Sequence, residues 1–390
     1  MADIDTVAGG TGRSATTLEL FFDLVYVFAI TQVVAFVHHQ PTVVGLLKAA
    51  LLLQIMWWTW SIYTWTTNWT GTASTPIRLF LLATMGASLV MATGVSGAFE
   101  ESGPLFGSAL FAVRVLAASL YYVASKDYPV QRAAFLTFFP LSIAAAGMFL
   151  VGGFLEPRWL LILFLGGALL DLISAANAGR GSWAVDASHF AERNGLFIII
   201  ALGESVVGVG LTAAKVALDV PHLGAMVVAF AGIAGLWWVY FEGTAPHAER
   251  HLASATGKER GRVARDIYSF LHYPMVVGIV IFAVGMEDLV AHPVDPLPLV
   301  GRLAVSWGMG LVLLSIVAGY LRATGKVAWE KAGAMALLFA LAFVAANASA
   351  LVFAGLCVLI LALAIVVRAG LMRRTQGAAG EAVGASTPAG

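Results

Sequence analysis

The chain has 390 residues, of which 60% are hydrophobic and only 11% are charged, and its mean hydropathy is +0.88. A soluble domain carries about 25% charged residues, so this composition excludes an ordinary soluble globular protein. The net charge is zero, which gives no electrostatic basis for binding nucleic acid. The single cysteine, Cys357, excludes an internal disulfide and a thiolate metal cluster.

Apolar runs of about 20 residues, the length that crosses a bilayer core of roughly 30 Å, recur along the whole chain. They predict an all-α, polytopic membrane protein with about 12 transmembrane helices, at residues 18–38, 43–66, 77–98, 104–123, 132–153, 158–178, 189–213, 222–242, 266–287, 298–320, 328–346 and 348–370. Only Asn347 separates the last two runs, so eleven spans remain an alternative. The first run is followed by His-His-Gln-Pro rather than by a small-residue cleavage site, which favours a permanent span over a signal peptide.

The positions of lysine and arginine predict the orientation. If the N-terminus is cytoplasmic, the segments outside the cytoplasm hold only Lys48, Arg158, Lys215 and Arg302. The cytoplasmic segments then hold Arg13, Arg78, Lys126, Arg132, Arg180, Arg250, Lys258, Arg260, Arg262, Arg265, Arg322, Lys326, Lys331, Arg368, Arg373 and Arg374. This asymmetry follows the positive-inside rule and predicts that both termini are cytoplasmic.

The two halves of the chain resemble each other. "MWWTW" (56–60) has a counterpart in "LWWVY" (236–240), and Pro-Leu pairs open the spans at 104 and 298. We therefore predict two parallel six-helix repeats, as in some transporter folds. The resulting organisation is a cytoplasmic N-terminal segment at 1–17, a first membrane repeat at 18–178, a second at 179–370, and a disordered cytoplasmic tail at 371–390.

Three motifs resemble a known family. They are "LELFFDLVYVFAITQV" (18–33), "HFAERNGLFIIIALGESVVGVG" (189–210) and "FLHYPMVVGIVIFAVG" (270–285). Together they are similar to the bacterial low temperature requirement protein A family of multi-pass membrane proteins, over about residues 17–368. The resemblance implies a membrane protein of the bacterial inner membrane and assigns no catalytic residues.

Charged groups inside a bilayer cost about 2.5–3.5 kcal/mol each on insertion scales, so they usually face a partner or a water-filled cavity. Glu19 and Asp23 are four residues apart on one helix face, with Asp23 about one turn deeper. This acidic stripe could capture a cation or relay a proton. The alternative is that it pairs with Arg193 or Arg265 and locks two spans together, or anchors the helix end at the interface.

The segment 189–210 carries the next candidates. His189, Glu192 and Arg193 share a helix face at the predicted cytoplasmic end, and Glu204 follows near the midplane in a glycine-rich run. Glycines let helices approach closely or unwind, so Glu204 is a candidate site for a proton or cation. The alternative is that the glycines only pack helices and that Arg114 neutralises Glu204.

Arg114 lies in the middle of a predicted span and keeps its charge, so it requires Asp171 or Glu204 as a partner. Either a purely structural ion pair or the binding of an anionic group would account for Arg114 and Asp171.

Three residues, His272-Tyr273-Pro274, interrupt the span at 266–287. Pro274 is expected to kink the helix and to free a carbonyl near Phe270. His272 could then serve in gating or proton transfer, or could be a satisfied histidine at a kink. The histidines of "HAERH" (247–251) lack the order of a zinc peptidase motif, and we expect them to be solvated in a cytoplasmic loop.

These features favour a secondary transporter or permease of a small solute, which could be coupled to protons. The expected partners are the lipid bilayer and a small solute or proton, with no nucleic acid, cofactor or metal. One alternative is a sensor, scaffold or assembly factor whose buried charges are structural. A second is an intramembrane enzyme acting on lipid, which the short cytoplasmic loops make less favoured.

Overall fold

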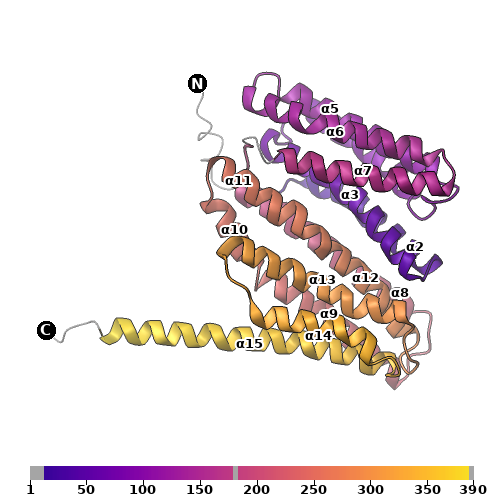
Figure 1. Cartoon of the computed structure of the whole chain (residues 1–390), viewed down its shortest axis with the longest axis vertical. Helices are drawn as coiled ribbons and strands as arrows, with labels where there is room; N and C mark the ends of the chain where they lie inside the picture. The colour runs from indigo at the N-terminus through magenta and orange to yellow at the C-terminus, as the bar shows by residue number, and fades with distance from the viewer. Residues whose placement is uncertain (1–12, 179–182, 386–390) are drawn as a thin grey trace.

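The computed structural model describes residues 13–178 and 183–385 and builds them almost wholly as helices (Figure 1). The first half contains α2 (Thr17–His39), α3 (Val43–Thr70), α4 (Thr75–Thr93), α5 (Gly103–Ala124), α6 (Pro129–Gly153) and α7 (Pro157–Ala178). The second half contains α8 (Ala187–Ala213), α9 (Val220–Phe241), α10 (Ala245–Ser254), α11 (Gly257–Val263), the π-helix η1 (Ala264–Leu271), α12 (His272–Ala291), α13 (Leu299–Thr324), α14 (Trp329–Val344) and α15 (Ala350–Ala385). Most of the predicted N-terminal segment, Arg180 and residues 386–390 lie outside the described residues.

The prediction of an all-α polytopic membrane protein is confirmed. Within the described residues, eleven helices are long and apolar enough to cross a membrane. The predicted span at 328–346 corresponds to α14, which has only 16 residues and is therefore about 24 Å long. That is shorter than a hydrocarbon core of roughly 30 Å, so the structure supports eleven full-length spans and one short helix. The last two predicted spans are nevertheless separate helices, divided by residues 345–349.

The helices form two groups, α2–α7 and α8–α15 (Figure 1). In the first group α2 packs against α4, α4 against α5, α5 against α6, and α6 against α7. In the second group α8 packs against α12, α12 against α13, α13 against α14, and α14 against α15. This order of neighbours is compatible with a duplicated unit, and the division into repeats at 18–178 and 179–370 stays a prediction.

Helix α12 lies at the centre of the molecule and contacts α2 and α3 of the first group as well as α8, α9, α13 and α15 of its own. Its packing against α13 depends on two facing glycines. A Cβ atom on Gly278 would lie 2.5 Å from the carbonyl oxygen of Gly308, and one on Gly308 would lie 2.7 Å from that of Gly278. Two helix backbones can approach this closely only where side chains are absent.

The predicted cytoplasmic loop at 247–264 is mostly helical, with His247 exposed as expected and His251 partly buried. Ala248 and Leu252, four residues apart on α10, are buried against Val263 and Tyr268. An apolar pair at this spacing lies on one helix face, which is the signal that our interpretation of "HAERH" passed over. The segment therefore packs onto the end of the membrane helices.

The C-terminal helix also differs from expectation. Helix α15 continues to Ala385, through most of the segment 371–390 that we predicted to be disordered. An existing helix adds residues without the cost of a new nucleus. The helix can therefore continue through residues 372–385, which combine four alanines that favour helix with three glycines that do not. Its end projects beyond the other helices (Figure 1).

Candidate functional site

The beginning of α2 is fixed by a capping box. The Glu19 backbone N–H donates to Thr16 Oγ1 at 3.4 Å, and the Thr16 backbone N–H donates to Glu19 Oε2 at 2.9 Å. This reciprocal pattern satisfies two free donors at the helix start. It explains why a glutamate stands at the beginning of an apolar helix, and the Thr-x-x-Glu spacing is visible in the sequence.

Glu19 also contacts the second group of helices. Its Oε2 atom lies 3.2 Å from His189 Nε2 of α8, and Asn68 Nδ2 of α3 lies 3.0 Å from His189 Nδ1. Because the Asn68 amide donates, His189 Nδ1 accepts and Nε2–H donates to Glu19, an assignment that follows from the network. The other carboxylate oxygen, Glu19 Oε1, is buried and finds no hydrogen-bond partner among the described residues.

Asp23 forms the next contact between α2 and α8. Arg193 binds it in a bidentate pair, with NH1 and NH2 each 2.8 Å from a carboxylate oxygen. Trp60 Nε1 of α3 donates a third hydrogen bond at 2.8 Å. The Arg193 guanidinium also lies over the Trp60 ring, 5.7 Å from its centroid. The structure thus selects Arg193 and not Arg265 as the partner, because Arg265 binds Asp266 at 2.6 Å.

Glu192 does not share the buried face of His189 and Arg193. Its side chain is exposed, and its Oε2 atom accepts the backbone N–H of Ala15 at 2.9 Å. Glu192 lines a cavity with about 460 Å³ of free space, together with Arg13, Tyr240, Glu249 and Tyr268. This volume falls within the range of about 300–1,000 Å³ that is typical of sites for small molecules.

Arg114 pairs with Asp171, which confirms that a buried acid at similar depth is its partner. NH1 and NH2 of Arg114 lie 3.0 and 2.8 Å from the two Asp171 oxygens. Nε donates to Thr59 at 3.0 Å and NH1 to Ser142 at 2.9 Å. The two charged side chains are 1% and 0% exposed. Every one of these contacts is internal to α3, α5, α6 and α7, so the geometry favours the structural interpretation.

Glu204 is separate from this pair and has a different environment. It is 5% exposed, and its Oε2 atom accepts a hydrogen bond from Thr31 Oγ1 of α2 at 2.8 Å. No cation within the described residues lies at ion-pair distance from it. The alternative that Arg114 neutralises Glu204 is therefore wrong. The Arg114 guanidinium instead donates its hydrogen bonds to Asp171 and to the hydroxyls of Thr59 and Ser142.

A second acid, Glu287 of α12, lies against Gly208, one turn closer than Glu204 to the C-terminal end of α8. Its Oε2 atom is 3.1 Å from His38 Nε2 of α2, while Oε1 is buried without a hydrogen-bond partner among the described residues. A Cβ atom on Gly208, one turn after Glu204, would overlap Glu287 Oε1. The absence of a side chain at Gly208 therefore leaves room for the Glu287 carboxylate against α8.

His272 is satisfied on both ring nitrogens. Its Nδ1 lies 2.8 Å from the Ile267 carbonyl, and its Nε2 lies 2.9 Å from the Tyr240 hydroxyl. The expected kink is instead the π-helix η1, in which hydrogen bonds reach back five residues. Pro274 cannot donate to Ser269 five residues earlier, and the Ser269 carbonyl accepts a hydrogen bond from Trp57 Nε1 at 2.8 Å. The expected free carbonyl near Phe270 is thus that of Ser269, and Trp57 is its donor.

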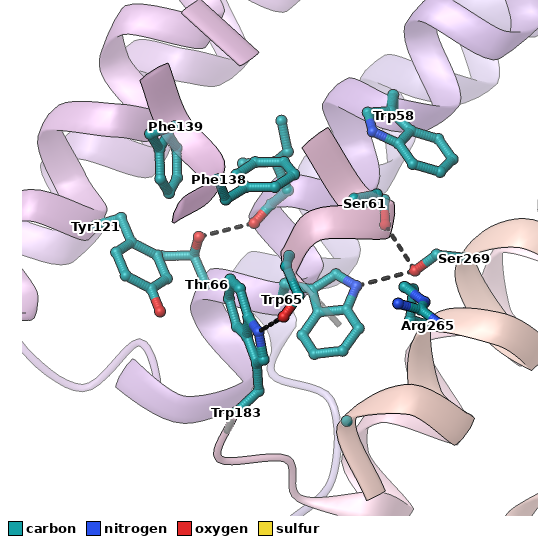
Figure 2. A pocket seen from close by; sticks show the side chains of 14 residues that line it. Trp58, Ser61, Trp65, Thr66, Tyr121, Phe138, Phe139, Trp183, Arg265 and Ser269 are labelled. Atoms are coloured by element: carbon teal, nitrogen blue, oxygen red, sulfur yellow. Dashed lines mark hydrogen bonds between the residues drawn. The ribbon is translucent and has the colours of Figure 1, made fainter. Parts of the chain in front are cut away.

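Figure 2 shows a small aromatic cavity that brings α3 and η1 together. Ser61 and Trp65 both point to Ser269, with Ser61 Oγ and Trp65 Nε1 at 3.3 and 2.9 Å from Ser269 Oγ. The free space is only about 50 Å³, far below the range for small-molecule sites. The hydrogen bonds beside this cavity connect the two groups of helices. The cavity itself is too small for a solute.

Six of the eight candidate residues thus fall into three sets, while Glu192 is exposed and His272 lies apart at the start of α12. Glu19, Asp23 and Arg193 meet at the α2–α8 contact, Arg114 and Asp171 form a separate buried pair, and Glu204 lies toward the other end of α8. Trp60, Asn68, Thr31, His38 and Glu287 take part in these contacts and were missed as site residues. For Glu287 the signal was the apolar triplet 289–291, which follows Asp288 and carries α12 to Ala291, so that the acid stays inside the helix.

Comparison with known proteins agrees with the motifs. A family model described as bacterial low temperature requirement A protein (LtrA) matches residues 14–367. An uncharacterised protein of Rhizobium meliloti (strain 1021), RA0937, is 30% identical over 292 residues, which cover 70% of this chain and 69% of that relative. No solved structure matches the chain.

Proposed function

The chain belongs to the bacterial low temperature requirement A family, and from that premise and its buried charges we propose that it is a proton-coupled secondary transporter of a small solute. We place it in the bacterial inner membrane with both termini in the cytoplasm, as the lysine and arginine asymmetry favours. The observation that carries the proposal is Glu204, a buried acid without a cationic partner among the described residues. An acid in this position is costly unless it binds a proton or a cation.

The surroundings of Glu204 support a route along α2 and α8. Glu19 and His38 lie at opposite ends of α2, 19 residues or about 28 Å apart, close to the thickness of a bilayer core. Ionisable side chains of α8 and α12 contact α2 near both ends, through Glu19–His189 and Asp23–Arg193 at one and His38–Glu287 at the other. Proton-transferring groups are thus present on both sides of the membrane midplane.

An aromatic layer separates the two polar ends. Tyr26 of α2 lies between Asp23 and Thr31, and its ring centroid is 6.3 Å from that of Phe197 on α8. Phe197 in turn packs against Trp60 and Trp57, with ring centroids 4.5 and 5.1 Å away. Bulky side chains in the middle of a polar route are suited to block free flow, as a coupled transporter requires. In the proposed cycle a solute occupies the 460 Å³ cavity beside Glu192, and protonation of Glu204 accompanies its passage.

The test is proton flux in proteoliposomes that contain a pH-sensitive dye. Sodium, potassium and a panel of amino acids, sugars and nucleosides are added in turn under an imposed pH gradient. We expect at least one compound to accelerate proton movement and expect Glu204→Gln to abolish the effect. Glu101→Gln, which changes an exposed acid in the loop before α5, is the matched control and should behave as the unmodified protein.

A specific observation favours the non-transport alternative. Arg114–Asp171 and Asp23–Arg193 are both buried, bidentate pairs, as expected of a scaffold or sensor held together by ionic contacts. Folded protein that moves protons with none of the compounds would refute transport and leave this alternative as the better account.

A further inference from the structure

A basic cavity lies apart from the α2–α8 contact, between α9, α10, α12, α13, α14 and α15. It has about 150 Å³ of free space, and five basic side chains line it: His247, His251, His272, Lys331 and Arg368. Both ring nitrogens of His272 already have hydrogen-bond partners, which leaves the other four for a ligand. None of the residues that line it belongs to α2 or α8. It is therefore distinct from the α2–α8 contact, although Tyr240 lines both this cavity and the cavity beside Glu192.

Lys331 is the central group of this cavity. It is 9% exposed, and it makes no hydrogen bond or ion pair with any residue whose side chain the structure describes. Its ammonium group lies beside the junction of α9 and α10, where a Cβ atom on Gly243 would be 3.7 Å from Lys331 Nζ. A buried ammonium group without an anionic partner is unfavourable, so an anion in the cavity would stabilise it.

Three further donors surround the same space. The NH1 atom of Arg368 forms an ion pair with Glu330 at 3.6 Å. Because this distance is beyond hydrogen-bond length, the N–H groups of Arg368 are not used in a hydrogen bond to Glu330. His251 Nε2 is buried without a hydrogen-bond partner among the described residues. Ala328, the N-cap of α14, lines the cavity and has no side-chain acceptor for the free N–H groups of the first turn. The positive end of the α14 dipole adds to the attraction for an anion.

We propose that this cavity binds a phosphate group, carried either by a phospholipid head group or by a small phosphorylated molecule. The donors approach from an ammonium, a guanidinium, an imidazole and a helix start, which suits a tetrahedral anion with several acceptor oxygens. The free space is below the roughly 300–1,000 Å³ of pockets for whole drug-sized molecules. The site therefore holds the anionic head of a larger molecule or a small phosphate compound.

The test uses the full chain in nanodiscs of phosphatidylcholine, with inorganic phosphate and phosphatidylglycerol as separate probes. Calorimetric titration measures the binding of inorganic phosphate, and native mass spectrometry measures retained phosphatidylglycerol. Lys331→Gln removes the central charge, and Lys326→Gln removes an exposed charge five residues earlier as the matched control. Lys331→Arg keeps the charge and should retain binding.

We expect one of the two probes to bind at a single site, and expect Lys331→Gln to weaken that binding roughly tenfold or more while Lys326→Gln leaves it unchanged. Binding of inorganic phosphate identifies a soluble source, and binding of phosphatidylglycerol alone identifies a lipid source. A shift of the unfolding temperature of the unmodified protein by the same probe gives a readout that does not depend on the stability of any variant. Absence of binding by both probes, or equal losses in Lys331→Gln and Lys326→Gln, would overturn the proposal.

Discussion

Replacing Arg114 alone should destabilise the protein strongly, whereas replacing Arg114 and Asp171 together should be much less harmful. In Arg114→Leu, the Asp171 carboxylate stays fully buried and loses both of its guanidinium contacts. In Asp171→Leu, the guanidinium keeps only the hydroxyls of Thr59 and Ser142. Removing one member of a buried pair typically costs about 3–5 kcal/mol, because the other charge is left without a partner.

The double variant Arg114→Leu/Asp171→Leu removes both charges. Both Thr59 and Ser142 lose their contact with Arg114. Thr59 keeps its hydrogen bond to the Ile55 carbonyl at 2.7 Å, so only the Ser142 hydroxyl is left without its hydrogen-bond partner. One lost neutral hydrogen bond corresponds to about 1 kcal/mol. The double variant should thus be more stable than either single variant, and its proton flux should persist because the pair has no part in the proposed route.

The assay is unfolding in mixed micelles with increasing dodecyl sulfate, followed by the fluorescence of the 11 tryptophans. Arg158→Leu changes an exposed arginine at the start of α7 and should shift the unfolding free energy by less than about 0.5 kcal/mol. If the losses in the two single variants simply add in the double variant, Arg114 and Asp171 do not stabilise each other and the reasoning fails. A stable double variant without proton flux would show that Arg114 and Asp171 take part in transport.

Three further predictions address orientation and packing. With Cys357 replaced by serine, Ser254→Cys at the exposed last residue of α10 should be protected from an impermeant thiol reagent in intact cells, and labelling there would overturn the cytoplasmic placement. Gly278→Ala should lower the unfolding free energy by about 1–3 kcal/mol through overpacking, whereas Gly203→Ala, which meets no atom within 4 Å, should be neutral or slightly stabilising; equal effects would contradict the close approach of α12 and α13. Trp57→Phe should cost about 1–3 kcal/mol, because a π-helix carbonyl is left without its donor, and unchanged unfolding would show that this hydrogen bond is dispensable.

The sequence predicted the helices of the fold more completely than the contacts of the candidate site. Hydropathy alone predicted the helices, since a membrane span has to be long, apolar and helical to satisfy its backbone. It could not separate α14 from a full span, because the apolar run at 328–346 includes residues that the structure places in loops. The duplication and the orientation are not tested by the helices alone.

For the site, the sequence identified most of the buried charges, although Glu192 proved exposed and Glu287 was missed. It did not identify which of these charges meet. Arg114 had two acids at similar depth, and only the packing of α5 against α7 selects Asp171 over Glu204. Asp23 likewise had two candidate arginines. Trp60 and Asn68 were missed because they lie in α3, whose hydropathy is that of an ordinary membrane span. Their hydrogen bonds to Asp23 and His189 depend on which face of α3 is turned toward α2 and α8.

The short helix α14 has a consequence for the choice of membrane. A helix of about 24 Å in a bilayer of roughly 30 Å has a hydrophobic mismatch of about 6 Å. The lipids around α14 must then thin or tilt, at fractions of a kcal/mol per Å of mismatch. Lipids with shorter acyl chains relieve this deformation and should gather along the α14 side of the protein. The eleven longer helices match a bilayer of ordinary thickness, so the thinning should be confined to the α14 side of the protein.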